Sequence, residues 1–412
     1  KNLSDIVKVM ASDDFEGRAP GTPGEDKTVA YLIAQMQKIG LEPGGVNGSW
    51  TQAVPMMRSE VKSPVTMTFS TPETVLTLNQ GVSVSVDTAT ALTNISAADV
   101  PVVFVGFGAN APEQDWDDYG DIDLADKLVI YLVNDPDFAA QPDEPVAGRF
   151  GNRRMTYYGR WAYKFEEAAR RGAFGALVIH ETEAAGYDWS VAAAGAGENV
   201  SLANKDPKAL PVKLQGWLHN DAAHKLLATA GHDLDALREK ARQPEIQAFE
   251  LEGIRFNADL EVDITTFDSQ NVLGLIPGSA RPEEVIMASA HWDAYGIGAP
   301  DEQGRTVRAG ANDDALGSAG ILEIARVIKA APALERSVLL AFWTAEEAGL
   351  VGSMAYAADP IFPIEKTVAN FTLDILQTAG AANDVILVGK GQSELEDDLD
   401  RVAKAAGRYV TE

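Results

Sequence analysis

The chain has 412 residues, more than one compact core usually holds, so we expect two or three domains. Its formal net charge is −27, from 34 Lys and Arg against 61 Asp and Glu, which argues against nucleic acid and anionic membrane surfaces as partners. The sequence contains no cysteine, so disulfides and thiol catalysis are excluded. No apolar run reaches the roughly 20 residues of a membrane span.

The first predicted element is a helix from Glu25 to Ile39 that ends at Gly40. Its apolar face consists of Val29, Leu32, Ile33 and Met36. Alternating strand-like stretches follow between Val61 and Val86. We predict that residues 1–96 form the first of three structural parts of the chain.

The pattern changes over residues 97–263. Short apolar strands and one helix alternate there: strands Val102–Val105 and Leu128–Val133, helix Lys164–Arg171, and strand Ala176–Ile179. This pattern predicts a separate α/β unit inserted into the chain. The interrupted sheet resumes at Gln270–Gly278, so residues 264–412 form the third part.

The last third carries three apolar runs, typical of buried parallel strands: Val285–Ala290, Val338–Phe342 and Val368–Leu373. A helical pattern separates the first two runs, with Ile321, Ile324, Ala325 and Ile328 at helical spacing. The order strand, helix, strand predicts an open, mostly parallel α/β sheet with helices on both faces. In such a sheet the carboxyl ends of the strands form the ligand crevice.

Polar groups follow these strands at the predicted crevice: His291, Asp313, the pair Glu346-Glu347, and Asp374. Each alone has an ordinary structural explanation. Asp313-Asp314 before a helix would be an N-cap, the Glu pair a solvated turn, and His291 a semi-buried side chain. Asp374, however, lies in an apolar stretch where an unpaired carboxylate is costly to bury. Together these residue types are the ligands that zinc takes from proteins.

The chemistry assigns a metal role to four of these residues. Asp313, at the crevice floor, is our candidate for the bridge between two zinc ions about 3.5 to 4 Å apart. His291 and Asp374 would complete the ligands of one ion, and Glu347 would bind the other. The ligand set therefore predicts a two-metal hydrolase that attacks its substrate with an activated water.

The remaining assignments are catalytic. Glu346 and Glu347 are adjacent, so their side chains diverge and only one can easily face the metals. We predict that Glu346 is the general base and acid, which takes a proton from water and passes it to the leaving amine. Asp293, two residues after His291, is predicted to fix the tautomer of the imidazole.

At these residues the chain resembles metallopeptidase family twenty-eight, the co-catalytic zinc aminopeptidases. The family's ordered His-x-Asp, Asn-Asp-Asp, Glu-Glu and Asp match His291 to Asp293, Asn312 to Asp314, Glu346-Glu347 and Asp374. The stretches Ser12–Arg18 and Gly21–Gly24 are similar to the segment that opens many bacterial members. The resemblance implies a peptidase domain formed by residues 1–96 and 264–412, and a protease-associated domain over residues 97–263.

The resemblance also implies a fifth ligand, a His some tens of residues after Asp374. The five histidines are His180, His219, His224, His232 and His291, and none follows Asp374. We therefore expect the natural polypeptide to continue beyond Glu412, with the C-terminal part of the peptidase domain and this ligand. The four histidines of the insertion are interpreted as structural or solvated.

The expected function is removal of N-terminal residues from peptides by a two-zinc aminopeptidase, because an acidic crevice favours a substrate with an α-ammonium group. Carboxypeptidase or dipeptidase action stays open, since Arg305 and Arg308 could hold a carboxylate. A glutaminyl cyclase type transferase and a non-catalytic binding protein built on the same fold also stay open. The resemblance to exported bacterial members suggests a periplasmic or secreted protein whose leader has been removed.

Overall fold

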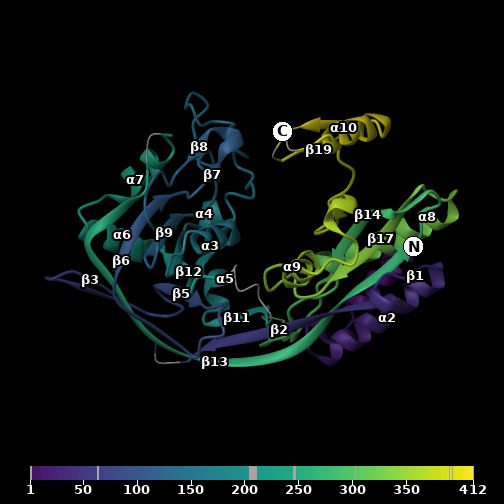
Figure 1. Cartoon of the computed structure of the whole chain (residues 1–412), viewed down its shortest axis with the longest axis horizontal. Coiled ribbons are helices and arrows are strands. Elements are labelled where there is room, and N and C mark those ends of the chain that lie inside the picture. Colours follow the sequence, from purple (N-terminus) through teal and green to yellow (C-terminus); the bar gives the residue numbers. More distant parts are fainter. Residues whose placement is uncertain are drawn as a thin grey trace. The chain divides into compact units, whose positions relative to one another are not determined.

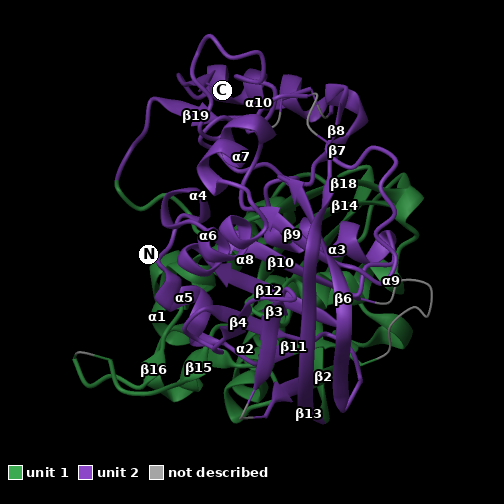
Figure 2. Cartoon of the chain, turned by 90° about the vertical axis from the view of Figure 1, so that its left-hand side faces the viewer, with its two compact units in different colours: residues 1–58, 200–204, 265–379 green, residues 59–199, 205–264, 380–412 purple. Residues whose placement is uncertain are grey.

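The computed structural model describes residues 2–62, 65–203, 211–244, 247–301, 303–388, 390–391 and 393–411. These residues form two compact units (Figure 2). Unit 1 comprises residues 1–58, 200–204 and 265–379, and unit 2 comprises residues 59–199, 205–264 and 380–412. Three strands cross between the units in sequence: β2 (Thr51–Val61), β11 (Glu198–Leu202) and β13 (Phe249–Ile276).

Unit 1 is an α/β unit, and Figure 1 labels its main elements. Its helices are α1 (Asn2–Met10), η1 (Asp13–Arg18), α2 (Pro23–Ile39), η2 (Val46–Gly48), η4 (Ala311–Ala315), α8 (Leu316–Ala330), α9 (Val351–Ala358) and η5 (Ile364–Lys366). Its other strands are β1 (Glu42–Pro43), β14 (Arg281–His291), β15 (Gly296–Ile297), β16 (Val307–Arg308), β17 (Arg336–Trp343) and β18 (Thr367–Thr372).

The sheet of unit 1 runs in the order β18-β14-β17-β13. Strand β14 is parallel to both β17 and β18, whereas β13 is antiparallel to β17. Both faces of β17 are buried, which explains its continuous apolar run. Val338, Leu340 and Phe342 pack with α1, α2 and α8, while Leu339, Ala341 and Trp343 pack toward Tyr356 of α9. The predicted mostly parallel sheet with helices on both faces is therefore confirmed.

One detail of the predicted elements of unit 1 is wrong. Strand β18 is parallel to β14 as predicted, but it is not buried: Val368 and Phe371 are each 51% exposed. The reason is its place at the end of the strand order, where β14 is its neighbour on one side. The predicted helix is present as α8, in which Ile321 and Ala325 are buried and Ile324 is 40% exposed.

Unit 2 is a second α/β unit. Its helices are η3 (Pro112–Gln114), α3 (Trp161–Arg170), α4 (Thr182–Ala185), α5 (Trp189–Ala194), α6 (Asn220–Thr229), α7 (Leu234–Ala241) and α10 (Leu395–Ala405). Its other strands are β3 (Thr66–Ser70), β4 (Val75–Leu78), β5 (Val84–Asp87), β6 (Asn94–Gly106), β7 (Asn110–Ala111), β8 (Trp116–Asp117), β9 (Leu128–Leu132), β10 (Gly175–His180), β12 (Leu214–His219), β19 (Asp384–Ile386) and β20 (Tyr409–Thr411).

The main strands of unit 2 run in the order β13-β6-β9-β10-β12-β5, and the four from β6 to β12 are parallel. Helix α3 contributes to the core on one face, and α6 and α7 contribute to the core on the other. The strands and the helix predicted within residues 97–263 are present. The predicted domain limits, and the assignment as a protease-associated domain, stay predictions. The compact units divide the chain after residues 58, 199, 204, 264 and 379.

Candidate metal centre

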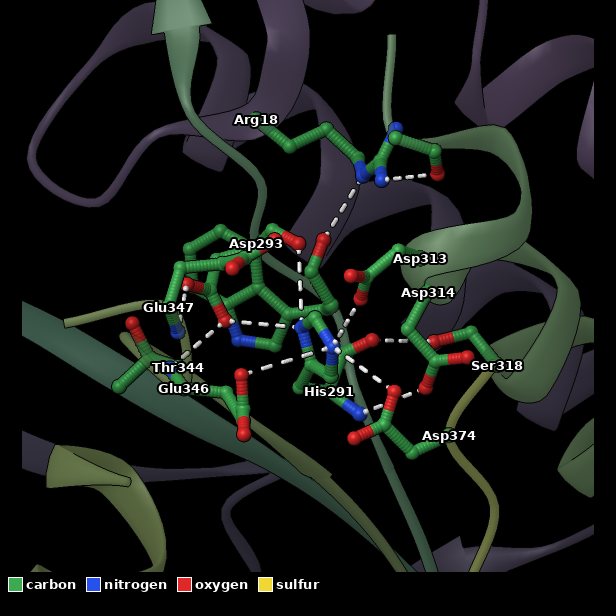
Figure 3. A network of polar contacts seen from close by, with 12 residues as sticks. Arg18, His291, Asp293, Asp313, Asp314, Ser318, Thr344, Glu346, Glu347 and Asp374 are labelled. Atoms are coloured by element: carbon green, nitrogen blue, oxygen red, sulfur yellow. Dashed lines mark hydrogen bonds and ion pairs between the residues drawn. The ribbon is translucent and has the colours of Figure 1, made fainter. Parts of the chain in front are cut away.

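The sequence-predicted site residues of unit 1 meet at one edge of its sheet. Strand register pairs His291 of β14 with Trp343 of β17, and Ser289 with Thr372 of β18, so the three parallel strands end together. His291 is the last residue of β14, and Asp374 follows β18 by two residues. Asp313 lies in the short helix η4, directly before α8. The side chains therefore converge from different elements (Figure 3).

The ring of His291 is the centre of this cluster. Its Nε2 atom lies 3.0 Å from Asp313 Oδ1, 3.8 Å from Glu346 Oε2 and 3.9 Å from Asp374 Oδ1. Candidate ligand atoms of His291, Asp313 and Asp374 all lie within 4.8 Å of one another. The histidine side chain is 2% exposed, whereas those of Asp313 and Asp374 are 41% and 46% exposed. One buried nitrogen thus faces carboxylates that solvent can reach.

Asp293 connects the histidine to the turn that carries the Glu pair. Its Oδ1 atom lies 3.4 Å from His291 Nδ1, and its backbone carbonyl lies 3.2 Å from the same nitrogen. The carboxylate also accepts backbone N–H bonds from Glu346 (3.0 Å) and Glu347 (3.3 Å). Asp293 is itself buried. It is therefore placed to orient the imidazole and to fix the start of the Glu346-Glu347 turn at the same time.

The two adjacent glutamates have different surroundings. Glu346 directs Oε2 toward the ring of His291. Glu347 is hydrogen-bonded with the phenol of Tyr295, and its Oε1 is buried without a hydrogen-bond partner. Burial raises the pKa of Glu347 to about 7 and also raises the pKa of Glu346. Glu347 stands outside the group formed by His291, Asp313 and Asp374, so its predicted ligand role stays a prediction.

The cluster fits a divalent cation. Burial lowers the pKa of His291, but the hydrogen bond and charge of Asp293, together with the charge of Glu346, outweigh burial and raise the pKa to about 10. This shift measures the concentration of negative charge around the ring. An unpaired buried carboxylate oxygen on Glu347 is costly unless a cation accompanies it. Imidazole nitrogen and carboxylate oxygen are ligands that zinc takes, with the imidazole neutral.

Asp314 supports the centre in a way that the sequence only partly indicated. Its Oδ2 accepts the backbone N–H of His291 at 3.2 Å, and its Oδ1 accepts that of Gly317 at 2.8 Å, in the first turn of α8. Ser318 donates its hydroxyl to the carbonyl of His291 at 2.9 Å. The expected helix-capping bond of the Asp-Asp pair is therefore made by Asp314, which leaves Asp313 to face the histidine.

The other four histidines have local structural surroundings in unit 2. The buried ring of His180 contacts Tyr187, Trp189 and Trp217. His219 accepts the backbone N–H of Asp221 at the start of α6. Within the described ranges, the one His, Asp and Glu group with metal-like spacing is that of His291, Asp313 and Asp374.

Residues 271–412 match the model of Peptidase family M28. Over this segment the chain is therefore similar to peptidase family M28. The match contains every residue of the cluster described above, from His291 to Asp374. Among curated relatives, aminopeptidase NAALADL1 of Rattus norvegicus is 32% identical over 139 residues, which cover 31% of this chain and 17% of the relative. Carboxypeptidase Q of Homo sapiens is 31% identical over 133 residues, which cover 31% of this chain and 25% of the relative.

The chain thus spans a quarter or less of the length of these relatives. A solved structure, the aminopeptidase from Aneurinibacillus sp. strain AM-1, aligns over 98% of this chain and 77% of its own. Its sequence identity is 19% and the TM-score is 0.48.

Proposed function

We propose that this chain carries a zinc-dependent exopeptidase activity, and that it acts as an aminopeptidase. The observation that carries the proposal is the position of His291 Nε2, within 4 Å of carboxylates from three separate segments of an M28 sequence. His291, Asp374 and the bridging Asp313 would hold zinc, with Glu347 as a further ligand. Zinc ions at this centre would polarise the scissile carbonyl and make water a nucleophile at neutral pH.

Glu346 is the proposed general base and acid. Its carboxylate is 25% exposed and faces the centre, so it can reach both solvent and a substrate. It would accept a proton from the attacking water as the C–O bond forms, and then pass that proton to the leaving amine as the C–N bond breaks. A pKa raised by burial suits a group that must hold this proton between the two steps. Asp293 would keep Glu346 in place through its backbone N–H.

The aminopeptidase assignment rests on charge. A peptide with a free α-ammonium group complements a centre with several carboxylates, and one of the relatives is named an aminopeptidase. Arg305 and Arg308, the candidates for a carboxylate site, are engaged within their own loop. Arg305 is paired with Asp301 at 2.8 Å, and Arg308 donates to the carbonyls of Arg305 and Ala299. Carboxypeptidase action is kept as the second candidate because carboxypeptidase Q is also among the relatives.

The test is a set of matched peptides incubated with the zinc-loaded protein and analysed by mass spectrometry. One peptide has both ends free, one is N-acetylated, one is C-terminally amidated, and one begins with Gln. We expect loss of the N-terminal residue from the free and amidated peptides and none from the acetylated one. Loss of C-terminal residues from the acetylated peptide would instead establish a carboxypeptidase.

Two further outcomes distinguish a transferase and a binding protein from a peptidase. Loss of ammonia from the Gln peptide without chain cleavage would establish a glutaminyl cyclase type reaction. Unchanged peptides in every sample, with zinc bound to the protein, would support a non-catalytic binding protein and contradict the proposal.

A further inference from the structure

Arg18, at the end of η1, is fully buried beside the metal centre of unit 1 (Figure 3). Its guanidinium donates four hydrogen bonds, all to backbone carbonyls. Nε donates to Trp292 at 2.8 Å, and Nη2 donates to Gly310 at 2.8 Å. Nη1 donates to Met10 at 2.7 Å and to Ala309 at 2.8 Å. A lysine cannot replace this planar fork, because its ammonium is a compact group with three donors.

The acceptors of Arg18 lie on the two segments that supply the proposed ligands. Trp292 is flanked by His291 and Asp293, and Gly310 precedes Asp313 by three residues. One side chain therefore spans the end of β14 and the loop that leads into η4. The backbone adds to this connection, since Ala294 donates its N–H to the Arg18 carbonyl at 3.4 Å.

Gly17, the residue before Arg18, shows how closely η1 packs against its neighbours. Gly17 has a φ of +67°, and a Cβ atom at this position would lie 2.4 Å from the carbonyl oxygen of Gly296 and 2.7 Å from that of Arg308. No side chain can occupy this space without moving the backbone. The segment Asp13–Arg18 is thus packed against β15 and β16, the paired strands that lie between His291 and Asp313 in the sequence.

Arg18 also brings a positive charge close to an acidic centre. Burial lowers the pKa of Arg18 to about 10, and the nearby carboxylates Asp293 and Asp314 act in the opposite direction. The group is therefore charged at neutral pH. A buried charge is tolerated only when it is paired and hydrogen-bonded, and here four carbonyls and the carboxylates meet that need.

We infer that Arg18 is a positioning residue for the metal centre, which sets the spacing between His291 and Asp313 by clamping the carbonyls of Trp292 and Gly310. The inference rests on the proposed function, because it concerns the same metal site. The motif Asp13–Arg18 lies far in sequence from every proposed ligand. Its residue types alone therefore do not indicate this role. A purely structural anchor would stabilise the fold without changing the affinity of the folded protein for zinc.

The test compares Arg18→Lys and Arg18→Met with Lys27→Met. Lys27 is a matched control, because it holds the same segment from outside, through the Asp14 carbonyl (2.5 Å) and the Glu16 carboxylate (3.4 Å). Zinc affinity is measured by competition with a chromophoric chelator, and cobalt absorption spectra report ligand geometry. Loss of groups that orient metal ligands typically weakens affinity about 10- to 100-fold. We expect this loss, and a changed cobalt spectrum, in both Arg18 variants but not in Lys27→Met.

Wild-type zinc affinity and an unchanged cobalt spectrum in folded Arg18→Lys would overturn the inference. Gly310→Ala gives a second test if the Arg18 variants do not fold. Its Cβ would lie 2.5 Å from the carbonyl oxygen of Asp313, 2.6 Å from Ala294 Cβ and 2.7 Å from Arg18 Nη2, so it would displace the guanidinium together with the loop that the guanidinium holds. Wild-type zinc affinity in folded Gly310→Ala would also overturn the inference. Failure of the unsubstituted chain to bind zinc is a different result, because it would overturn the proposed function itself.

Discussion

Glu346 and Glu347 are adjacent residues for which we propose different chemical roles. Replacing Glu346 by Gln keeps its shape but removes the group that accepts a proton. If Glu346 is the general base, turnover should fall by about 10²- to 10⁴-fold. Zinc content should stay at the wild-type level, because the proposed ligands are other residues. Parallel measurements of kcat and of zinc by mass spectrometry check both statements.

The matched control for Glu346→Gln is Glu335→Gln, which changes a solvent-exposed glutamate paired with Arg281. It should leave kcat unchanged. Near-normal turnover of Glu346→Gln would refute the general-base assignment.

Asp313 has the shortest contact with His291, and we propose that it bridges the metals. Asp313→Ala should therefore release zinc from the whole centre and abolish activity, which equilibrium dialysis against a zinc buffer can measure. Asp301→Ala, in an exposed loop, is the control. Retention of the full zinc content by Asp313→Ala would contradict the bridge.

Arg18 shows why part of the centre could not be predicted from the sequence. The ligand residues carry recognisable chemistry and follow apolar strands, so His291, Asp313 and Asp374 could be named in advance. Arg18 acts on backbone carbonyls as far as 292 residues away. Carbonyls are present at every residue, so no side-chain pattern marks them as its partners. For Asp314, the sequence indicated a bond to the start of the following helix. Its other bond, in which a carboxylate oxygen accepts the backbone N–H of His291, could not be predicted for the same reason.

Among the predicted strands of unit 1, the correct predictions concern strands that are buried on both faces. The apolar runs of β14 and β17 correctly predicted parallel strands, because both faces of those strands are covered. The run at Val368–Leu373 looks the same in sequence, yet β18 stands at the end of the strand order and exposes Val368 and Phe371. Position within a sheet depends on partners elsewhere in the chain. A single run of residues therefore predicts a strand but not its neighbours.

Asp314 links β14 to α8 and makes the stability of this connection depend on pH. Burial raises its pKa from 3.8 to about 7, so between these values the folded metal-free chain binds more protons than the unfolded chain. Its free energy of unfolding should therefore fall as pH rises across this window, by at most about 1.4 kcal/mol per pH unit for one proton. Asp314→Asn should make the slope shallower. Urea unfolding at several pH values, with a chelator present, measures it; identical slopes in both proteins would refute this account.

The net charge of −27 affects the whole molecule. Mutual repulsion of the excess carboxylates opposes the compact state, and dissolved salt screens it. Raising sodium chloride from about 10 to about 100 mM shortens the screening length from about 30 to about 10 Å. We expect a higher Tm for the metal-free chain, by a few degrees, in a calorimetric scan. Potassium chloride should act equally, and a Tm that falls with either salt would contradict the repulsion argument.

Within the described ranges, no helix is both long and apolar enough to cross a bilayer. The strands β2, β11 and β13 have residues in both units. The catalytic proposal, in contrast, concerns unit 1 alone, which contains every residue of the metal centre.

The most direct test of the central claim is a zinc titration of the metal-depleted protein, with removal of an N-terminal residue followed in the same sample. The account predicts no activity after depletion, and activity that returns in proportion to bound zinc until the centre is filled. Full activity without metal, or tight zinc binding at this centre with no hydrolysis of any free peptide, would contradict it.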